Sequence, residues 1–215
     1  MPDLSYVIVA VCAYFVGSIP TGFLAGRAKG VDIRKVGSGN MGATNVFRSV
    51  GKGWGIFVLV VDGLKGFAAC TWMVDLLLRL HLISMPPDEE LMRIIAGIAA
   101  VLGHNFTCWL KFKGGKGIAT SAGVYFALAP WAVTIALGTW IIAVVLTRYV
   151  SVASIASAIA LPAAVWFMSD SLLLKIATTA LGLMAIYKHK KNIQRLMEGT
   201  ESRFGKKTPT PEAAK

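Results

Sequence analysis

Residues 4–25 read LSYVIVAVCAYFVGSIPTGFLA and contain no charged side chain. An uncharged apolar run of about 18 or more residues can cross the hydrocarbon core of a bilayer, which is about 30 Å thick. The rest of the chain has a similar character, because 55% of its 215 residues are hydrophobic and only 15% are charged. No Lys or Arg precedes the run, and it continues past Pro20 without a small-residue cleavage pattern, which argues against a removable signal peptide. The sequence therefore predicts an all-α integral membrane protein.

Polar residues gather in three short clusters between the apolar runs, at residues 35–48, 104–117 and 188–201. Most of the basic residues, 17 of 22, lie in or near these clusters or in the tail that follows the third. Basic loops of membrane proteins stay on the cytoplasmic side. We therefore expect all three clusters at the cytoplasmic face. The basic residues are not spread along a soluble face, so they do not indicate a nucleic-acid partner.

The breaks between apolar runs predict the number of crossings. Both ends of residues 117–188 are basic, which requires an even number of crossings between them. Pro130, residues 148–151 and residues 169–170 cut this region into four pieces of about 13 to 17 residues, at or below the usual length of a spanning helix. We predict about seven transmembrane helices, or five if two pieces are re-entrant, with the N-terminus outside and the C-terminus cytoplasmic.

The chain is expected to form one domain with a short tail. Residues 1–204 are predicted to be a single polytopic membrane domain, in which the acidic loop at residues 86–90 lies outside. Residues 205–215 are polar and contain two prolines, which predicts a disordered cytoplasmic tail. The three cysteines lie in or beside apolar runs without a C-x-x-C pattern, so no metal site is predicted.

The first cluster, KVGSGNMGATNVFR at residues 35–48, has the composition of a phosphate-binding loop. Three glycines within residues 37–42 leave backbone N–H groups free to converge on an anion. Ser38 and Asn40 add short hydrogen-bonding side chains, and Arg48 offers a bidentate donor. The alternative is a flexible interfacial loop that anchors lipid headgroups.

The second cluster contains GHNF at residues 103–106 and KFKGGKG at residues 111–117. Its glycines let the backbone approach an anion closely, and its lysines supply positive charge. It is not a Walker A loop, because Gly117 stands after Lys116 where Ser or Thr is required. A simple positive-inside loop is the alternative.

The third cluster, KHKKNIQRLMEGTE at residues 188–201, is expected to continue the last helix into the cytoplasm. Helical spacing places His189, Asn192 and Arg195 near one face, where they could meet a ligand. An ordinary basic amphipathic end that docks on anionic lipid is the alternative.

Asp62 and Lys65 lie inside an apolar run, three residues apart and hence on one helix face. Ionisable groups at such a depth are costly and usually line a functional or internally paired site. We expect a structural ion pair beneath the site rather than a catalytic pair.

Taken together, the clusters resemble the motifs of a known enzyme family. The patterns GSGNxGATN at residues 37–45, GHNF with KFKGGKG, and KHxxNIxRLxxGxE at residues 188–201 closely resemble the three motifs of the bacterial acyl-phosphate:glycerol-3-phosphate acyltransferases, the PlsY family. All three occur in order and cover nearly the whole chain.

The resemblance implies a reaction in the bacterial inner membrane, with the active site on its cytoplasmic face. A fatty acyl group would pass from acyl phosphate to the 1-hydroxyl of sn-glycerol 3-phosphate, giving lysophosphatidate and phosphate, the first acylation of phospholipid biosynthesis. It also implies no cofactor, no use of acyl-CoA or acyl carrier protein, and a soluble acyl-phosphate-forming enzyme that supplies the donor.

The resemblance also implies roles for individual residues. The expected catalytic residues are Ser38, Arg48, Lys116, His189 and Asn192. The expected substrate- and phosphate-binding residues are Gly37, Gly39, Asn40, Gly42, Thr44, Asn45, His104, Asn105, Lys113, Gly114, Gly115 and Gly117.

An acyl phosphate is already activated, so we expect no covalent acyl-enzyme. His189 or a phosphate oxygen of the donor would accept the hydroxyl proton, and His104 would orient the second cluster.

Two other classes of function are alternatives to this one. A transporter for a phosphate-bearing solute would suit the intramembrane charges and interrupted helices. However, the polar clusters map to one side and the two halves show no repeat. A catalytically silent scaffold would not need Gly-Ser-Gly-Asn and Gly-Gly-Lys-Gly in such density.

Overall fold

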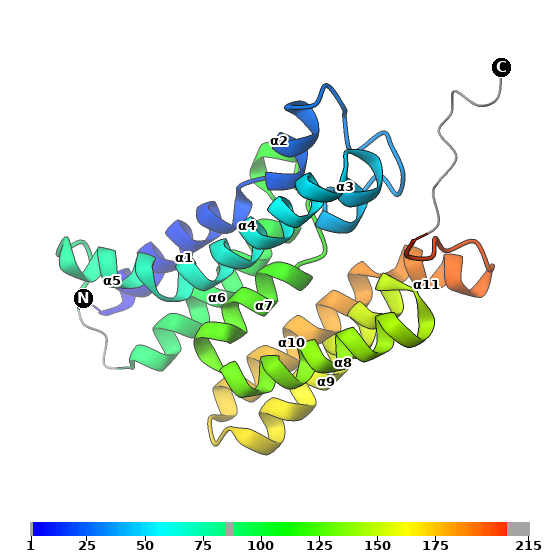
Figure 1. Ribbon diagram of the computed structural model, residues 1–215. Helices are drawn as coiled ribbons and strands as arrows, with labels where there is room; N and C mark the ends of the chain where they lie inside the picture. The colour runs from blue at the N-terminus through cyan, green and yellow to red at the C-terminus, as the bar shows by residue number, and fades with distance from the viewer. Residues whose placement is uncertain (1, 85–87, 206–215) are drawn as a thin grey trace.

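The computed structural model describes residues 2–84 and 88–205, and within them all regular structure is helical, as predicted (Figure 1). Residues 206–215, which make up most of the predicted disordered tail, lie outside the described residues, as do residues 85–87 at the predicted outer loop. The helices are α1 (Pro2–Ser18), α2 (Thr21–Arg27), α3 (Ala43–Ser49), α4 (Lys52–Cys70), α5 (Trp72–Arg79), α6 (Glu89–Asn105), the 3₁₀ helix η1 (Cys108–Leu110), α7 (Ile118–Leu128), α8 (Pro130–Thr147), α9 (Val150–Met168), α10 (Leu172–Lys188) and α11 (Lys190–Met197).

The helices of the C-terminal half end where the sequence predicts breaks. α8 begins at Pro130, whose fixed φ suits a first helical turn, and it ends at Thr147, before Arg148, which has a φ of 60°. Ser171 caps α10 by accepting a hydrogen bond from the Leu174 amide at 3.2 Å. The three breaks are confirmed. α8 and α9, with 18 and 19 residues, are longer than the predicted pieces because Pro130 and residues 150–151 are themselves helical.

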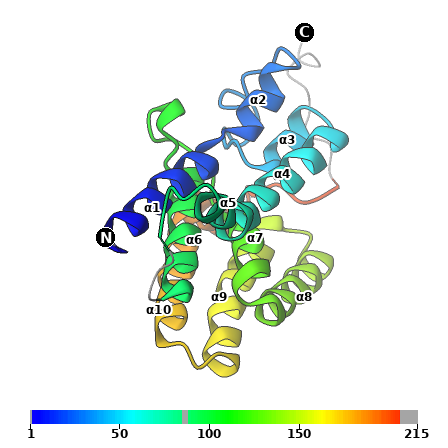
Figure 2. The same cartoon turned by 90° about the vertical axis from the view of Figure 1, so that its left-hand side faces the viewer.

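Glycines allow the closest contacts between helices. A Cβ on Gly17 of α1 would overlap the Ala100 carbonyl of α6, and a Cβ on Gly123 of α7 would overlap the Gly63 carbonyl of α4. Small residues at such contacts let helix backbones approach closely, which is how membrane helices gain packing energy without a hydrophobic driving force between them. α1, α4, α6 and α7 form one group, and α8, α9 and α10 lie to one side of it (Figure 2).

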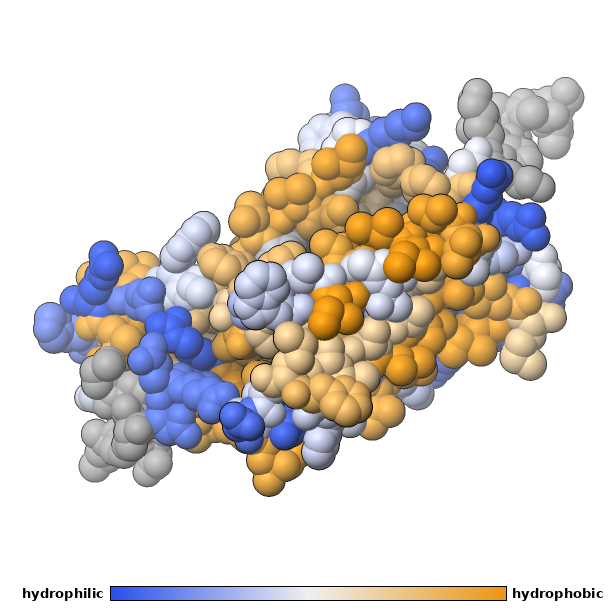
Figure 3. All heavy atoms as spheres, turned by 60° about the horizontal axis from the view of Figure 1, so that its bottom comes forward, coloured by the Kyte–Doolittle hydropathy of each residue, from blue (hydrophilic) through white to orange (hydrophobic). Residues whose placement is uncertain are grey.

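A wide apolar surface surrounds the helices. Five helical stretches among the described residues are long and apolar enough to cross a membrane, at residues 4–27, 52–79, 89–110, 130–147 and 150–168. α7 has 11 residues and α10 has 17, so both fall below that length. Large apolar side chains such as Leu146 and Phe167 are 77% and 91% exposed. Figure 3 shows hydrophobic residues over the middle of the visible face and hydrophilic residues towards its ends. This surface is that of an integral membrane protein.

The three clusters come together at one end of the helices. In Figure 1, α2, α3 and α11 lie at the end where α10 finishes, and α5 and the N-terminus lie at the other. The connection from η1 to α7, which carries the second cluster, returns to the same end. This arrangement builds one polar site from segments far apart in the chain.

Candidate active site

The loop of the first cluster is organised around Asn45, in the first turn of α3. The side-chain amide of Asn45 is buried and donates to the carbonyl oxygens of Ile33, Val36 and Asn40 at 3.1, 3.0 and 2.8 Å. Its Oδ1 accepts a hydrogen bond from the Ser38 amide at 3.0 Å. Every polar group of this side chain is therefore committed to the loop backbone, so Asn45 shapes the loop.

Two glycines of the same loop have left-handed backbone conformations, with φ values of 57° at Gly37 and 68° at Gly39. A side chain is strained in that region, and a Cβ on Gly37 would also overlap the Asn45 amide oxygen. The next turn is closed by Asn40, whose Oδ1 accepts from the Gly42 amide at 2.8 Å. These local bonds place Ser38, Gly39 and Asn40 at the tip of the loop.

The loop of the second cluster folds back onto the end of α6. The amides of Gly114 and Gly115 donate to the carbonyl oxygens of Asn105 and His104 at 3.2 and 3.0 Å. A Cβ on Gly115 would overlap the His104 imidazole, and a Cβ on Gly114 would overlap the His104 carbonyl oxygen. In the structure these two glycines serve close packing, and they deliver the next residue, Lys116, to the site.

The third cluster does not simply continue α10, contrary to prediction. His189 interrupts the helix, because its imidazole Nδ1 lies 2.8 Å from the Ala185 carbonyl oxygen, the usual acceptor for its backbone amide. The His189 amide bonds to the Ile186 carbonyl oxygen instead, and α11 begins at Lys190. Since a carbonyl oxygen only accepts, Nδ1 carries the proton and Nε2 is left as an acceptor.

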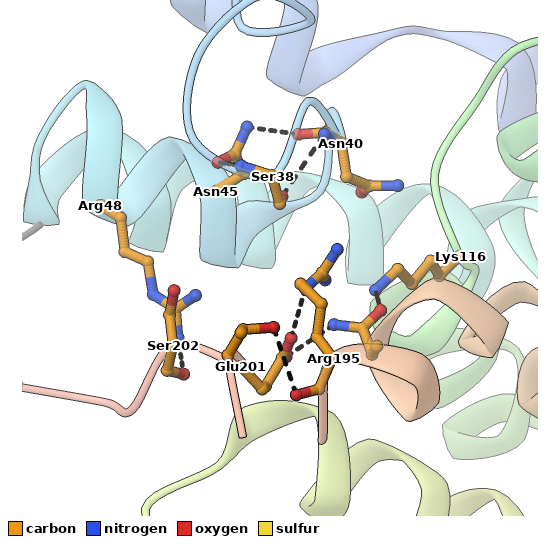
Figure 4. Close-up of polar contacts among 10 residues, drawn as sticks. Ser38, Asn40, Asn45, Arg48, Lys116, Arg195, Glu201 and Ser202 are labelled. Carbon is orange, nitrogen blue, oxygen red and sulfur yellow. Dashed lines mark hydrogen bonds and ion pairs between the residues drawn. The ribbon is translucent and has the colours of Figure 1, made fainter. Parts of the chain in front are cut away.

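A charged network connects the second and third clusters. Gly199, with a φ of 68°, turns the chain so that Glu201 returns to α11. Its carboxylate accepts from Arg195 Nε and from Asn192 Nδ2, both at 2.7 Å. The Lys116 ammonium in turn donates to Asn192 Oδ1. The Asn192 amide therefore bridges Lys116 and Glu201, which are labelled together with Arg195 in Figure 4.

All three clusters line one pocket of about 230 Å³. None of its lining residues among those described is acidic, and five of the ten are Lys or Arg. The lining residues are Ser38, Gly39, Asn40, Lys116, Tyr187, Lys188, Lys190, Lys191, Asn192 and Arg195. Such a concentration of donors with a nearby loop backbone suits a phosphate group.

The environment of the site shifts several pKa values. Burial lowers the pKa of Lys116 to about 8, with the Glu201 carboxylate opposing the shift and Arg195 adding to it. Burial and the Lys116 charge lower the pKa of His189 to about 4, so its imidazole is neutral at pH 7. Burial acts to raise the pKa of Glu201, but hydrogen bonds from residues including Asn192 and Arg195 hold it below its ordinary value. Glu201 is therefore an anion that orders its cationic neighbours.

A second polar group lies at the break between α1 and α2, where the structure brings Asp62 and Lys65 together as an ion pair. Lys65 Nζ lies 2.8 Å from Asp62 Oδ1 and donates to the Ile19 carbonyl oxygen at 2.9 Å, at the break between α1 and α2. His104 Nδ1 is 3.7 Å from the same Asp62 oxygen. Both members of the ion pair are buried. The pair therefore connects α4 to the break between α1 and α2. It also lies beside His104, the residue on which Gly115 packs.

The predicted site residues fall into three groups according to where they lie relative to the pocket. Five of them line the pocket: Ser38, Gly39, Asn40, Lys116 and Asn192. Arg48 does not, and its Nη2 donates to the Ser202 carbonyl oxygen at 3.1 Å beside the network. The other eleven are not among its lining residues: Gly37, Gly42, Thr44, Asn45, His104, Asn105, Lys113, Gly114, Gly115, Gly117 and His189.

Sequence reasoning missed Glu201 as a site residue, and it placed Arg195 on a possible ligand-facing stripe without assigning it a role. Both stand in the third motif, and the signal that could have found them is the opposite charges on either side of a glycine that can end a helix. Tyr187, the residue before the third cluster, also lines the pocket. Among the described residues, no group of three or more His, Cys, Asp or Glu is placed to hold a metal.

Comparisons with known proteins agree with the motifs. The family model described as glycerol-3-phosphate acyltransferase matches residues 7–199. A protein of that name from Trichlorobacter lovleyi is 46% identical over 192 residues, which is 89% of this chain and 94% of the relative. Another from Geobacter sulfurreducens is 45% identical over 201 residues, 94% and 98% of the two chains.

Two crystal structures have the same fold. Both are of PlsY, described as an integral membrane glycerol 3-phosphate acyltransferase, one in a glycerol 3-phosphate form and one in a lysophosphatidic acid form. Their TM-scores are 0.83 and 0.81 at 37% and 36% identity, and each match covers 94% of this chain and 96% of the other. The resemblance predicted from the three motifs is confirmed: the chain belongs to the glycerol-3-phosphate acyltransferase family of integral membrane proteins, the PlsY family.

Proposed function

We propose that this protein transfers a fatty acyl group from acyl phosphate to the 1-hydroxyl of sn-glycerol 3-phosphate, giving lysophosphatidate and phosphate. The observation that carries the proposal is the single cationic pocket, built by all three clusters at the polar end of a membrane protein. Both substrates bear a phosphate, and the acyl chain of the donor can remain among the apolar helices. The glycerol 3-phosphate and lysophosphatidic acid forms of the related PlsY support the acceptor and the product.

In this mechanism the protein positions the substrates and stabilises charge. The glycerol hydroxyl oxygen attacks the acyl carbonyl carbon, the bond from that carbon to the phosphate oxygen breaks, and phosphate leaves. The loop tip at residues 38–40 donates hydrogen bonds to phosphate, and the cations Lys116, Arg195 and Arg48 neutralise its charge. The hydroxyl proton passes to a phosphate oxygen of the donor or to Nε2 of His189, and the low pKa of His189 favours the phosphate oxygen. No acyl-enzyme forms on Ser38.

The proposal includes an orientation in the membrane. Seven helical passes connect the two ends of the molecule if α7 and α10 also cross, and this count leaves all three basic clusters on one side. By the positive-inside rule that side is cytoplasmic and the N-terminus is outside. The enzyme would act in a bacterial inner membrane, as one domain over residues 1–204, and receive acyl phosphate from a soluble acyltransferase.

The test is acyl transfer by the purified protein in detergent with radiolabelled glycerol 3-phosphate. Palmitoyl phosphate, palmitoyl-CoA and palmitoyl carrier protein are supplied in parallel. We expect lysophosphatidate from palmitoyl phosphate alone. Product only from the thioesters would overturn the proposed donor, and no product from any donor, in protein shown to be folded, would favour a transporter.

Matched lysine variants connect turnover to the pocket. Lys116→Ala removes a pocket cation and should lower kcat/KM by at least about 100-fold, the scale on which removing one charge-stabilising donor acts. Lys175 lies near the start of α10, at the opposite end of the molecule, so Lys175→Ala should leave turnover unchanged. Arg48→Ala should also cost more activity than His189→Ala. The reverse order, or an acyl group trapped on Ser38, would contradict the mechanism.

A further inference from the structure

Residues 201–204 form a short segment, here called the C-terminal strap, that ties together three separate parts of the polar end. It begins at Glu201, which α11 holds through Arg195 and Asn192. The segment then passes beside α3 and reaches the turn between α8 and α9. Only its first residue belongs to the third motif, and no strap residue lines the pocket.

The strap makes three hydrogen bonds beyond those of Glu201. The Ser202 carbonyl oxygen accepts from Arg48 Nη2 at 3.1 Å. Arg203 Nε donates to the Tyr149 hydroxyl at 3.0 Å, and the Phe204 amide donates to the Arg148 carbonyl oxygen at 2.6 Å.

Aromatic packing adds a contact to α3. The ring of Phe204 lies 5.6 Å from the ring of Phe47, the residue before Arg48. In Figure 4 the Arg48 side chain reaches towards Ser202, while Arg195 and Glu201 lie between it and Lys116.

Arg48 needs such support because its own helix is short. α3 has seven residues, and a helix of that length is unstable without tertiary contacts. Arg48 lies in the last turn of α3, and its long side chain loses considerable rotamer entropy when it is fixed in one orientation. The strap supplies an acceptor for the guanidinium and a ring for Phe47, so it restrains both the helix end and the side chain.

We propose that Arg203 and Phe204 are positioning residues, which hold the strap so that the Ser202 carbonyl oxygen orients the Arg48 guanidinium towards a phosphate-bearing substrate. This inference rests on the proposed function, in which Arg48 binds phosphate. One donor of the guanidinium goes to Ser202, and the remaining N–H groups are left for the ligand. Without the strap the charge of Arg48 would persist, but its orientation would be lost. The expected effect is therefore on substrate affinity.

The experiment compares KM and kcat of full-length variants, varying palmitoyl phosphate and glycerol 3-phosphate in turn. Phe204→Ala should raise the KM of one of these substrates about 5- to 10-fold and change kcat less than twofold. Arg203→Gln should raise the same KM in the same direction. Phe204→Tyr keeps the ring and should restore the wild-type KM, and Met197→Ala, at an exposed position of α11, is the matched control.

A second background tests whether the effect passes through Arg48. Arg48→Lys keeps a charge but loses the guanidinium fork, so adding Phe204→Ala to it should raise KM less than twofold further. A full 5- to 10-fold effect in that background would show that the strap acts elsewhere and would overturn the proposal.

Other outcomes separate the two hypotheses. Wild-type turnover with an unchanged KM in Phe204→Ala and Arg203→Gln, or a change in kcat alone, overturns the role of the strap and leaves the proposed function standing. No turnover by the folded wild type overturns the proposed function itself. If Phe204→Ala lowers the thermal midpoint, the result for Arg203→Gln decides, because that substitution removes only exposed contacts with Tyr149, one hydrogen bond and one cation–π contact.

Discussion

The ammonium group of Lys116 is partly withdrawn from solvent, and at the scale of single residues this makes its charge sensitive to pH. Its pKa, lowered to about 8, lies well below that of an ordinary lysine. A lysine whose pKa is lowered by burial loses its proton at a lower pH in the folded enzyme than in the unfolded chain. Burial of the charged form therefore costs stability in full below about pH 8, and this cost decreases as the pH rises from about 8 to 10.5, the ordinary lysine pKa.

The same titration predicts a pH profile for activity. We expect kcat/KM to fall above about pH 8, where free enzyme loses the Lys116 charge that attracts phosphate. Bound phosphate favours the charged lysine, so kcat should fall at a higher pH. Lys116→Arg keeps its charge throughout and should not show this alkaline fall, whatever its absolute rate. Identical profiles for Lys116→Arg and wild type would assign the fall to another group.

At the scale of elements, the buried ion pair between Asp62 and Lys65 holds α4 to the break in α1–α2. Asp62→Asn leaves the Lys65 charge buried without a counter-charge, and removing one partner of a buried pair typically costs about 3 to 5 kcal/mol. We expect a large fall in the thermal midpoint in detergent. Asp75→Asn is the matched control, because it breaks the partly exposed Asp75–Arg93 pair, and exposed pairs are worth about 1 kcal/mol or less.

The double variant Asp62→Leu with Lys65→Met completes this test. It removes both charges and should recover part of the stability lost by Asp62→Asn, because a buried pair can often be replaced by apolar residues at little cost. Equal falls for Asp62→Asn and Asp75→Asn would show that the buried pair contributes no more than a surface pair.

At the scale of the whole molecule, the proposed seven-pass arrangement predicts which connections face the outside. Single-cysteine reporters at Ala129 and Ser169, in a chain whose three natural cysteines are replaced, should react with a membrane-impermeant maleimide added to intact cells. A reporter at Thr200 should react only after permeabilisation. If α7 with α8, or α9 with α10, is re-entrant, the corresponding reporter at Ala129 or Ser169 stays unlabelled.

The sequence predicts the large features of this molecule because they depend on local signals. Pro130 and the polar break at residues 169–170 end helices through their own chemistry, and uncharged runs predict burial in lipid. The interruption at His189 could not be predicted in this way, since it depends on one imidazole competing for the Ala185 carbonyl oxygen.

The site residues also divide into those that local sequence signals predict and those whose role depends on the folded structure. Residue type and motif indicate Lys116 and Asn192, which line the pocket. The structural role of Asn45 depends on three carbonyl oxygens brought together only by the folded loop. The same holds for the strap, whose contact between Phe204 and Phe47 spans more than half of the chain and whose contact between Arg203 and Tyr149 spans 54 residues.

The placement of every polar cluster at one end has an energetic consequence for the cell. The charges of Asp62 and Lys65 cancel, and the proposed reaction begins and ends on the same side, so no net charge moves through the hydrocarbon. A transmembrane voltage of 100 mV is worth about 2.3 kcal/mol for each elementary charge that crosses, but here it has no charge to act on. This step of lipid synthesis would therefore run at the same rate in a cell whose membrane is depolarised.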